Sequence, residues 1–550
     1  MSSSSRSCAP SDRGAAGARR GGPLGRALAA ASAVAILAMP ATAWGDGGRI
    51  GLPEPIAPAP VRERAPVEPL PSAERWFRLS LGGTPCGWSR ETVRPVQDGI
   101  ETERESHLEL GRMGQRVVIR SRSAFRESAS GEPISAESER ITAGAPVRSG
   151  WTFGPDGIEV VQEQGGRRTV ERVPAPPPGW LAPAAAERML RAVATGGGTE
   201  ARWRSLDPES GPIEVRWVRT RVTAPGRTEP DGTVEWRTSG SLLERPSSEW
   251  TGPDGEVRRS RVDLGVGILE SRACTAEEAR APLGTAEVMA RSFIELRQDG
   301  SPLAGARSAR LALRARDGEL ADLPTAGAQR FVRTGPGTGE ASIDVGPSRD
   351  SDAADAADPR YRAASVMVDG GDPAIRRLAV EALEGAPAGP RERAERLRAF
   401  TWRHLSRKDL AQGLASASEA AASRAGDCTE HAVLLAALLR ADGIPARVAF
   451  GAVWVARAAR VRNAYGWHMW TQALVDGSWI DLDATFPDGG AGFDAARLLT
   501  GTSAADGASL DADLSRVVNM IGDLEIELIE VDGRPIAPAP DAGDAKGAPR

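Results

Sequence analysis

The chain has 550 residues, too many for one ordinary domain, and its length favours about three or four. Hydrophobic residues make up 41% of the composition, which is enough for sizeable cores. The charge is nearly balanced, with 69 basic and 74 acidic residues and a net charge of -5. The composition therefore gives no reason to expect nucleic acid or an anionic membrane surface as a partner.

Residues 1–45 have the pattern of an export signal. Arginines precede an apolar run from Ala27 to Met39, and Ala41-Thr42-Ala43 fits a small-residue cleavage site. The run is shorter than the roughly 20 residues that span a bilayer, and no other stretch is apolar enough to cross one. We expect a periplasmic or secreted protein. An Ala-rich disordered tail and an uncleaved signal anchor are the alternatives.

Shifts in composition divide the chain into a β-rich first part and a later part that contains helices. Linkers are predicted where Pro, Ala and acidic residues concentrate, and the Pro-, Ala- and Gly-rich end is predicted to be disordered. The predicted segments are a signal peptide at 1–45, a Pro-rich linker at 46–72, an antiparallel β domain at 73–283, a small β-rich segment at 284–345, a linker at 346–359, an α+β domain at 360–533 and a tail at 534–550.

The cysteines suggest either one disulfide or several buried thiols. Cys8 belongs to the predicted signal, which leaves Cys86, Cys274 and Cys428. An odd number in an oxidising compartment leaves at least one thiol free or pairing between chains. Cys86 and Cys274 can form a disulfide or stay as two buried thiols.

The β domain is predicted from alternation. Apolar residues alternate with polar ones around Phe77 and Val215, and turn signals such as Pro253-Asp254-Gly255 separate the strand-like runs. These features predict a large curved antiparallel sheet. Helix-like sequence from 183 to 193 is expected to connect its two parts.

Helical periodicity begins at Asp372. This residue is an N-cap candidate with Pro373 in the first turn, and Gly385 ends the pattern. A second helix is predicted from Pro390 to about His404.

The segment Gly426-Asp427-Cys428-Thr429-Glu430 carries the most chemical information. Asp427 can cap a helix and Glu430 follows three residues later, which is a capping-box arrangement. Cys428 is therefore predicted on the first turn of a buried helix. Free N–H groups and the helix dipole favour an anion there, so we expect the position to lower the pKa of the thiol and to help stabilise an oxyanion.

Strands are predicted after this helix, at 447–455, at 466–475 and at 479–483, the last two joined by a hairpin at Asp476-Gly477. The hairpin places His468 near one end of a strand and Asp483 on its neighbour, roughly opposite. A thiol needs a base to remove its proton, and His468 can take that role. Asp483 can then orient the imidazole.

These motifs, in order, resemble the core of the transglutaminase-like superfamily over roughly 130 residues. They are Gly-Asp-Cys at 426–428, Gly-Ile-Pro-Ala-Arg at 443–447, His-Met-Trp at 468–470 and Trp-Ile-Asp-Leu-Asp-Ala-Thr at 479–485. The resemblance implies a papain-like α+β core behind the N-terminal antiparallel β region. It implies Cys428 as nucleophile, His468 as base and Asp483 as orienting acid. Ala484 departs from the proline usual in the family, and the oxyanion side-chain donor is not identified.

Alternatives remain for each role. His431 follows Cys428 on the same helix face and is a rival base, and Asp481 shares a strand face with Asp483 and is its rival. The tryptophans of this region either line a substrate cleft or pack in the core; they are Trp467, Trp470 and Trp479. A zinc site built from Cys428, His431, His468 and Asp483 lacks a second Cys pair or a His-x-x-x-His spacing. We expect no metal and no cofactor.

The resemblance implies an exported thiol enzyme that cleaves or transfers an amide acyl group through Cys428. With water it would be a peptidase or amidase acting on a protein, peptide or cell-wall amide, and with an amine it would be a transglutaminase. The alternative is a non-catalytic binding or scaffold protein whose β regions recognise a partner.

Overall fold

The computed structural model describes residues 73–539, except 113, 143–145, 208–210, 241–244, 347–352, 387, 409–414, 459–460, 487–492 and 506–518. The predicted signal peptide at 1–45, the linker at 46–72 and residues 540–550 of the predicted tail lie outside the described residues.

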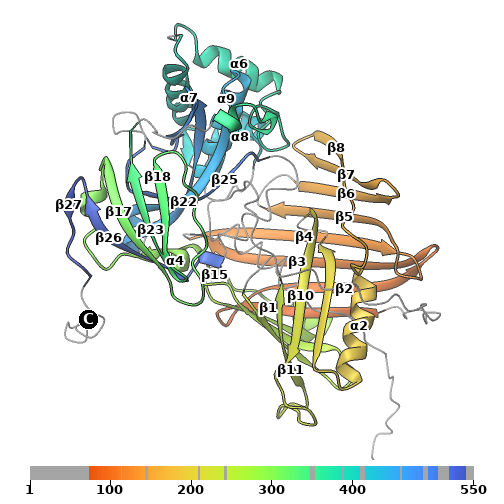
Figure 1. The fold of residues 1–550 in the computed structure, drawn as a ribbon. Helices are drawn as coiled ribbons and strands as arrows, with labels where there is room; N and C mark the ends of the chain where they lie inside the picture. Colours follow the sequence, from red (N-terminus) through yellow and green to blue (C-terminus); the bar gives the residue numbers. More distant parts are fainter. Residues whose placement is uncertain are drawn as a thin grey trace, which may run out of the picture.

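The N-terminal half is one large, curved antiparallel sheet (Figure 1), in which consecutive strands are neighbours within each of two parts, β1 to β8 and β9 to β14. It forms because apolar side chains alternate along each strand; in the first strand Phe77, Leu79 and Leu81 are all buried. From one edge to the other, the strands are β8 (Arg167–Val173), β7 (Gly157–Gln164), β6 (Pro146–Gly154), β5 (Pro133–Thr142), β4 (Gln115–Glu127), β3 (Gly99–Arg112), β2 (Thr84–Val96), β1 (Ala73–Leu81), β14 (Ile268–Cys274), β13 (Val257–Asp263), β12 (Ser247–Thr251), β11 (Val234–Gly240), β10 (Gly211–Arg221) and β9 (Glu200–Asp207).

The two parts of the sheet are joined by helix α2 (Pro183–Thr195), as the sequence predicts. Strand β14 returns to pair with β1, so the second part extends the first as a single sheet. A short helix, α3 (Ala276–Arg280), follows β14. The predicted antiparallel β region is confirmed.

The two cysteines of this region are free thiols rather than a disulfide. Cys86 is buried in β2, and burial raises the pKa of its thiol to about 12. Cys274 is half-buried at the end of β14.

A short tether links the large sheet to the rest of the molecule. It consists of β15 (Ala286–Glu287), which pairs with β3, then α4 (Met289–Ser292), then β16 (Ile294–Glu295), which pairs with β23 of the C-terminal domain. The 3-10 turn η1 (Ser301–Leu303) follows.

A separate small sheet combines strands that the sequence analysis assigned to different domains. It combines β17 (Ser308–Ala315), β18 (Gln329–Gly335) and β19 (Thr338–Asp344) with β26 (Leu524–Val531) and β27 (Arg534–Pro535). The small β segment is therefore not confined to 284–345, because β26, expected within 360–533, pairs with β17. The pairing of β17 with β26 joins segments more than 200 residues apart in the chain, and amino-acid composition does not predict such a pairing.

Two predicted irregular segments contain structure. The linker at 346–359 includes α5 (Ala353–Ala356) and leads into η2 (Pro359–Tyr361), and Trp479 donates a hydrogen bond of 2.7 Å to Asp355. Residues 534–539 of the expected disordered tail contain structure, because β27 pairs with β26 and Gln298 donates to the carbonyl of Ala537.

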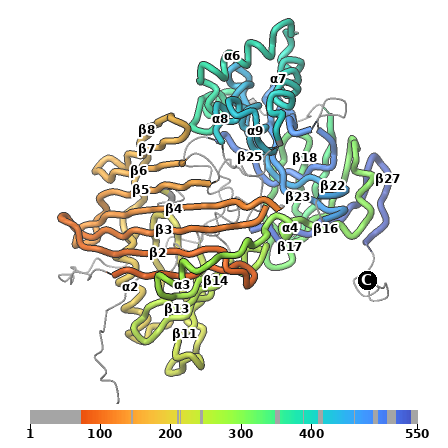
Figure 2. Tube along the Cα trace, turned by 180° about the vertical axis from the view of Figure 1, so that it is seen from behind, coloured from red at the N-terminus to blue at the C-terminus, as the bar shows by residue number. Residues whose placement is uncertain are grey.

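The C-terminal domain packs helices against an antiparallel sheet (Figure 2). The helices α6 and α7 have the predicted starts, and Asp372 accepts a capping hydrogen bond from the N–H of Ala374. A separate two-stranded pairing joins β20 and β21 in parallel. The elements are α6 (Pro373–Ala382), α7 (Pro390–His404), β20 (Arg407–Lys408), α8 (Ala417–Ser423), β21 (Ala425–Gly426), α9 (Cys428–Ala441), β22 (Ala446–Ala458), β23 (Val461–Val475), β24 (Ser478–Leu482) and β25 (Arg497–Ser503).

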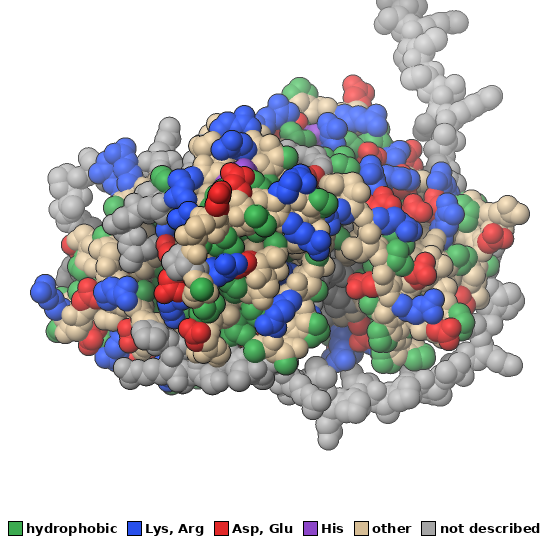
Figure 3. Space-filling model, turned by 90° about the horizontal axis from the view of Figure 1, so that it is seen from above, with side chains coloured by type: hydrophobic (Ala, Val, Ile, Leu, Met, Phe, Trp, Pro, Cys, Tyr) green, Lys and Arg blue, Asp and Glu red, His purple; other side chains and the backbone are tan. Residues whose placement is uncertain are grey.

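The surface seen from above carries acidic and basic side chains mingled with one another (Figure 3). This agrees with the nearly balanced composition. Among the described residues, no helix is both long and apolar enough to cross a membrane.

Candidate active site

Cys428 occupies the first position of α9, the helix at the centre of the C-terminal domain. The Asp427 side chain accepts from the N–H of Thr429 at 2.8 Å, and Glu430 accepts from the N–H of Asp427 at 2.9 Å, so the predicted capping box is present. A Cβ at position 426 would lie 2.4 Å from the Cβ of Glu430. Gly426 is therefore what lets Glu430 fold back over the cap.

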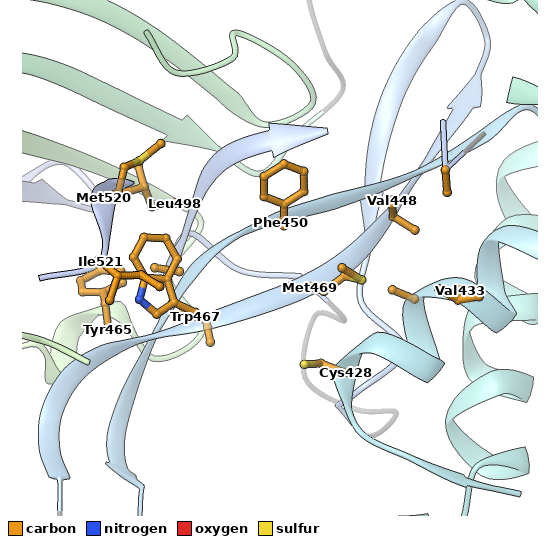
Figure 4. Close-up of a cluster of buried hydrophobic side chains, with 14 of the residues drawn as sticks. Cys428, Val433, Val448, Phe450, Tyr465, Trp467, Met469, Leu498, Met520 and Ile521 are labelled. Atoms are coloured by element: carbon orange, nitrogen blue, oxygen red, sulfur yellow. The ribbon is translucent and has the colours of Figure 1, made fainter. Parts of the chain in front are cut away.

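His468 lies opposite this helix tip on β23. That strand begins at Val461, so His468 lies in its middle. The sequence predicts a position near one end of the strand, and that prediction is wrong. The neighbouring Met469 N–H donates to the Cys428 sulfur, which places the thiol against this strand (Figure 4). Helix tip and strand therefore bring Cys428 and the His468 segment together.

Asp483 follows directly after β24 and contacts the imidazole of His468. The His468 Nε2 to Asp483 Oδ2 distance is 2.8 Å. With Nε2–H donating to the carboxylate, Nδ1 is the ring nitrogen that can accept a proton. The structure therefore brings His468 and Asp483 into contact, and it places Cys428 against Met469, the residue next to His468.

Arginines hold Asp483 in place, and the sequence reasoning missed both of them. Arg497 on β25 donates from Nε to Asp483 Oδ2 at 3.0 Å, and Arg398 on α7 donates to the Asp483 carbonyl at 3.3 Å. The N–H of Thr485 donates to Oδ1 at 2.9 Å. Burial by itself would raise the pKa of Asp483, but His468, Arg497 and these hydrogen bonds hold it well below its usual range. Asp483 is thus a fixed anion behind the imidazole.

The site is almost closed to solvent. Cys428 is 6% exposed, His468 7% and Asp483 0%. Burial, followed by the negative charge of Asp427, raises the pKa of the Cys428 thiol well above its usual value. The sequence predicts a lowered pKa for this thiol, because the helix dipole favours an anion. That prediction is wrong here, because desolvation of a sulfur anion outweighs the effect of the helix terminus.

The buried Glu430 carboxyl next to the cap is also perturbed. Burial and the charge of Asp427 raise its pKa to about 8. A raised carboxyl pKa means that Glu430 stays protonated in the folded protein at neutral pH, while Asp427 stays charged. The cap therefore carries one negative charge rather than two.

Glu430→Gln is expected to stabilise the protein at alkaline pH. The neutral carboxyl contributes its full stability below its ordinary pKa of 4.5, and loses it as pH rises toward about 8. A shift of this size corresponds to at most roughly 5 kcal/mol. Gln fits the same capping position and never ionises. Urea unfolding should show the two proteins alike at about pH 5 and the variant more stable at about pH 9. Parallel pH profiles would contradict the assignment of Glu430 as a protonated group.

The rival residues have other partners. His431 is fully buried, and its Nδ1 contacts the carbonyl of Asp427 within its own helix. Asp481 accepts from Trp470 Nε1 at 2.7 Å and from Gln472 Nε2 at 2.8 Å. The three tryptophans are buried in the core rather than arranged around an open cleft; they are Trp467, Trp470 and Trp479.

Phe486 is a further side chain at the site that the sequence reasoning did not single out. It is 38% exposed, and its ring centroid lies 5.7 Å from that of His468. The Arg497 guanidinium lies 4.9 Å from the same ring. An exposed aromatic ring beside the imidazole offers an apolar contact to a substrate chain. Among the described residues, no group of three or more His, Cys, Asp or Glu side chains has the arrangement of a metal site.

Comparison with known proteins places a family core over this site. Residues 377–484 match the model of the transglutaminase-like superfamily, so the chain carries a transglutaminase-like domain. The matched stretch contains Cys428, His468 and Asp483 but neither Arg497 nor any residue of the N-terminal sheet. No curated protein matches the sequence.

Two solved structures resemble parts of the chain. A beta-barrel-like protein of domain of unknown function DUF1849 from Brucella abortus is 12% identical, covers 38% of this chain and 98% of its own, and has a TM-score of 0.30. A candidate cysteine protease from Cytophaga hutchinsonii is 14% identical, covers 44% of this chain and 90% of its own, and has a TM-score of 0.26.

Proposed function

We propose that this protein is an exported thiol enzyme that cleaves or transfers amide acyl groups through Cys428. The observation that supports it most is the 2.8 Å contact between His468 and Asp483 beside a cysteine on the first turn of α9. A base, its orienting carboxylate and a nucleophile occur together at the N-terminal end of a helix, where the helix dipole favours an oxyanion.

The raised pKa of the thiol defines how the first step would proceed. Cys428 rests as a neutral thiol, so the proton leaves as the sulfur attacks the amide carbonyl carbon. His468 Nδ1 takes that proton, a C–S bond forms and the carbonyl π electrons move to oxygen. Asp483 stabilises the imidazolium that results.

Collapse of this oxyanion completes the acylation. The carbonyl re-forms, the C–N bond breaks and the leaving amine takes the proton from His468. The product is a thioester on Cys428. Water then attacks with His468 as base and releases a carboxylic acid, or a primary amine attacks and forms a new amide. A peptide, protein or cell-wall amide is the proposed substrate, met outside the cytoplasm if residues 1–45 act as an export signal.

A thiol-labelling experiment tests the proposal without a known substrate. Iodoacetamide followed by peptide mass spectrometry should modify Cys428, and both Cys428→Ala and His468→Ala should remove most of that labelling. Cys274→Ala is the matched control, because Cys274 is a half-buried thiol with no histidine among the groups that shift its pKa. Labelling of Cys274 with an inert Cys428 would favour the non-catalytic binding alternative.

Peptide libraries then separate hydrolysis from transfer. The protein is incubated with and without an added primary amine, and products are read by mass. Hydrolysis gives free carboxylates in both samples, whereas transfer gives amine adducts that depend on the added amine. Cys428→Ala should abolish either product, and turnover that survives this substitution contradicts the mechanism.

A further inference from the structure

An arginine from the N-terminal sheet reaches the tip of the catalytic helix. Arg112 is the last residue of β3, and its guanidinium donates to Oδ2 of Asp427, the residue before Cys428. The two residues lie 315 positions apart in the chain. Arg112 is only 2% exposed, and Asp427 is 7% exposed. The ion pair is thus a buried contact between the two halves of the molecule.

The tether holds this arginine in register with the catalytic strand. β15 pairs with β3 at Leu110 and Gly111, directly before Arg112. The tether contacts β23 seven residues after Glu287, where Ile294 pairs with Tyr465. Trp467, next to His468, donates to the carbonyl of Ser292 at 2.9 Å. One short segment therefore fixes both the end of β3 and the strand that carries the imidazole.

The tether can pack closely on β23 only if a glycine occupies position 466. Gly466 lies against Phe293, and a Cβ at that position would be 2.6 Å from the ring. The glycine before Trp467 and His468 is thus needed for the tether to pack on β23.

The charges around the sulfur need a cation. The titratable and charged groups that face Cys428 or its partners are Asp427, Glu430 and His431 at the start of α9, Arg112 from β3, Arg398 from α7, His468 from β23, Asp483 after β24 and Arg497 from β25. Asp427 is anionic and next to the thiol, where it opposes a second negative charge. Arg497 faces Asp483, so Arg112 is the arginine described at the cysteine end of the site.

We propose that Arg112 is a positioning residue of the Cys428 site, supplied by the N-terminal sheet, whose charge offsets Asp427 and so permits the sulfur anion to form. The inference rests on the proposed function. It gives the large sheet a role in catalysis, since the transglutaminase-like core is electrostatically complete only with β3 docked on it. In the structure the positive charge of Arg112 acts to lower the pKa of Cys428, against burial and Asp427.

The pH profile of Cys428 alkylation in the full chain tests this. Arg112→Met should raise the apparent pKa of alkylation by about one unit or more, so the rate at a given pH below it falls about tenfold. Arg112→Lys keeps the charge and should restore most of the rate. Asp427→Asn keeps a good N-cap and should shift the profile in the opposite direction. The double variant Arg112→Met with Asp427→Asn should return toward the wild-type profile.

Arg167→Met is the matched control for loss of docking. Arg167 on β8 also joins the sheet to the C-terminal domain, through Asp369 at 3.0 Å, in the turn before α6, and Asp372 at 2.6 Å, the N-cap of α6. It should lower stability without moving the alkylation profile. Equal shifts in Arg167→Met and Arg112→Met would show that docking, not the charge, matters, and would overturn the proposal.

Two further measurements distinguish a failure to fold from an effect on the reactivity of Cys428. Near-ultraviolet circular dichroism reports folding. If Arg112→Met does not fold, the Asp427→Asn profile decides, because a shift to higher pKa or no shift contradicts an offsetting cation. An unreactive Cys428 in the wild type removes the proposed function and this inference together. A reactive wild-type Cys428 with an unchanged Arg112→Met profile removes the inference alone.

Discussion

Asp483→Asn is expected to lower turnover by about three to four orders of magnitude, the loss typical of the orienting carboxylate in a triad. Oδ2 of Asp483 accepts from His468 and Arg497, while Oδ1 accepts from the Thr485 N–H. Asn has only one acceptor oxygen, so either orientation sets its NH2 group against a donor. The variant also loses the charge that stabilises the imidazolium. Steady-state kinetics on a library-derived peptide, or the alkylation rate of Cys428, measures the effect.

Asp481→Asn is the matched control for this prediction. Asp481 lies on the same hairpin, is partly buried, and likewise accepts on both oxygens, from Trp470 on one and from the Ala328 N–H on the other. It should therefore suffer a similar packing penalty, seen as a lower melting temperature, without a loss in kcat of more than a few-fold. If the two variants lose activity equally, Asp483 has no special role toward His468.

Arg497→Leu is expected to destabilise the fold by about 3–5 kcal/mol, because it leaves a buried carboxylate without its guanidinium partner. Arg497 contacts Asp483 Oδ2 from Nε at 3.0 Å and from an NH2 group at 2.9 Å, and is 4% exposed. It also lies about 5 Å from the Phe486 and Phe493 rings. The loss therefore combines an unpaired charge with lost packing.

The pH dependence of that loss has a definite sign. The folded pKa of Asp483 is depressed, so its stabilisation is present above the ordinary pKa of 3.8 and disappears as pH falls toward the folded value. Removing Arg497 weakens the depression, so acid unfolding should begin at a higher pH. Urea titrations at several pH values measure this. Arg310→Leu is the control, since Arg310 is 44% exposed and its solvent-screened pair with Glu340 should contribute little to stability.

The N-terminal sheet connects with these expectations through the tether and Arg112. In the proposal above, the transglutaminase-like core does not act alone, because the cation at its cysteine end comes from β3. The proposal therefore gives the sheet a role in the site.

The sequence by itself determined the features that depend on neighbours a few positions away. The starts of α6 and α7, the capping box at Asp427 and the strands on either side of the hairpin at Asp476 all follow from local capping, periodicity and turn chemistry. The order of motifs also indicated Cys428, His468 and Asp483 as a group, because the family pattern preserves order along the chain.

Only the tertiary structure decided what depends on contacts between distant segments. Arg112 and Arg497 come from strands outside the motif-bearing stretch, and β26 pairs with β17 from the other side of the C-terminal domain. The direction of the Cys428 pKa belongs to the same class. A capping pattern shows the helix dipole, but the desolvation that outweighs it arises from the packing of α9 against β23 and other distant segments, and no local pattern encodes that burial.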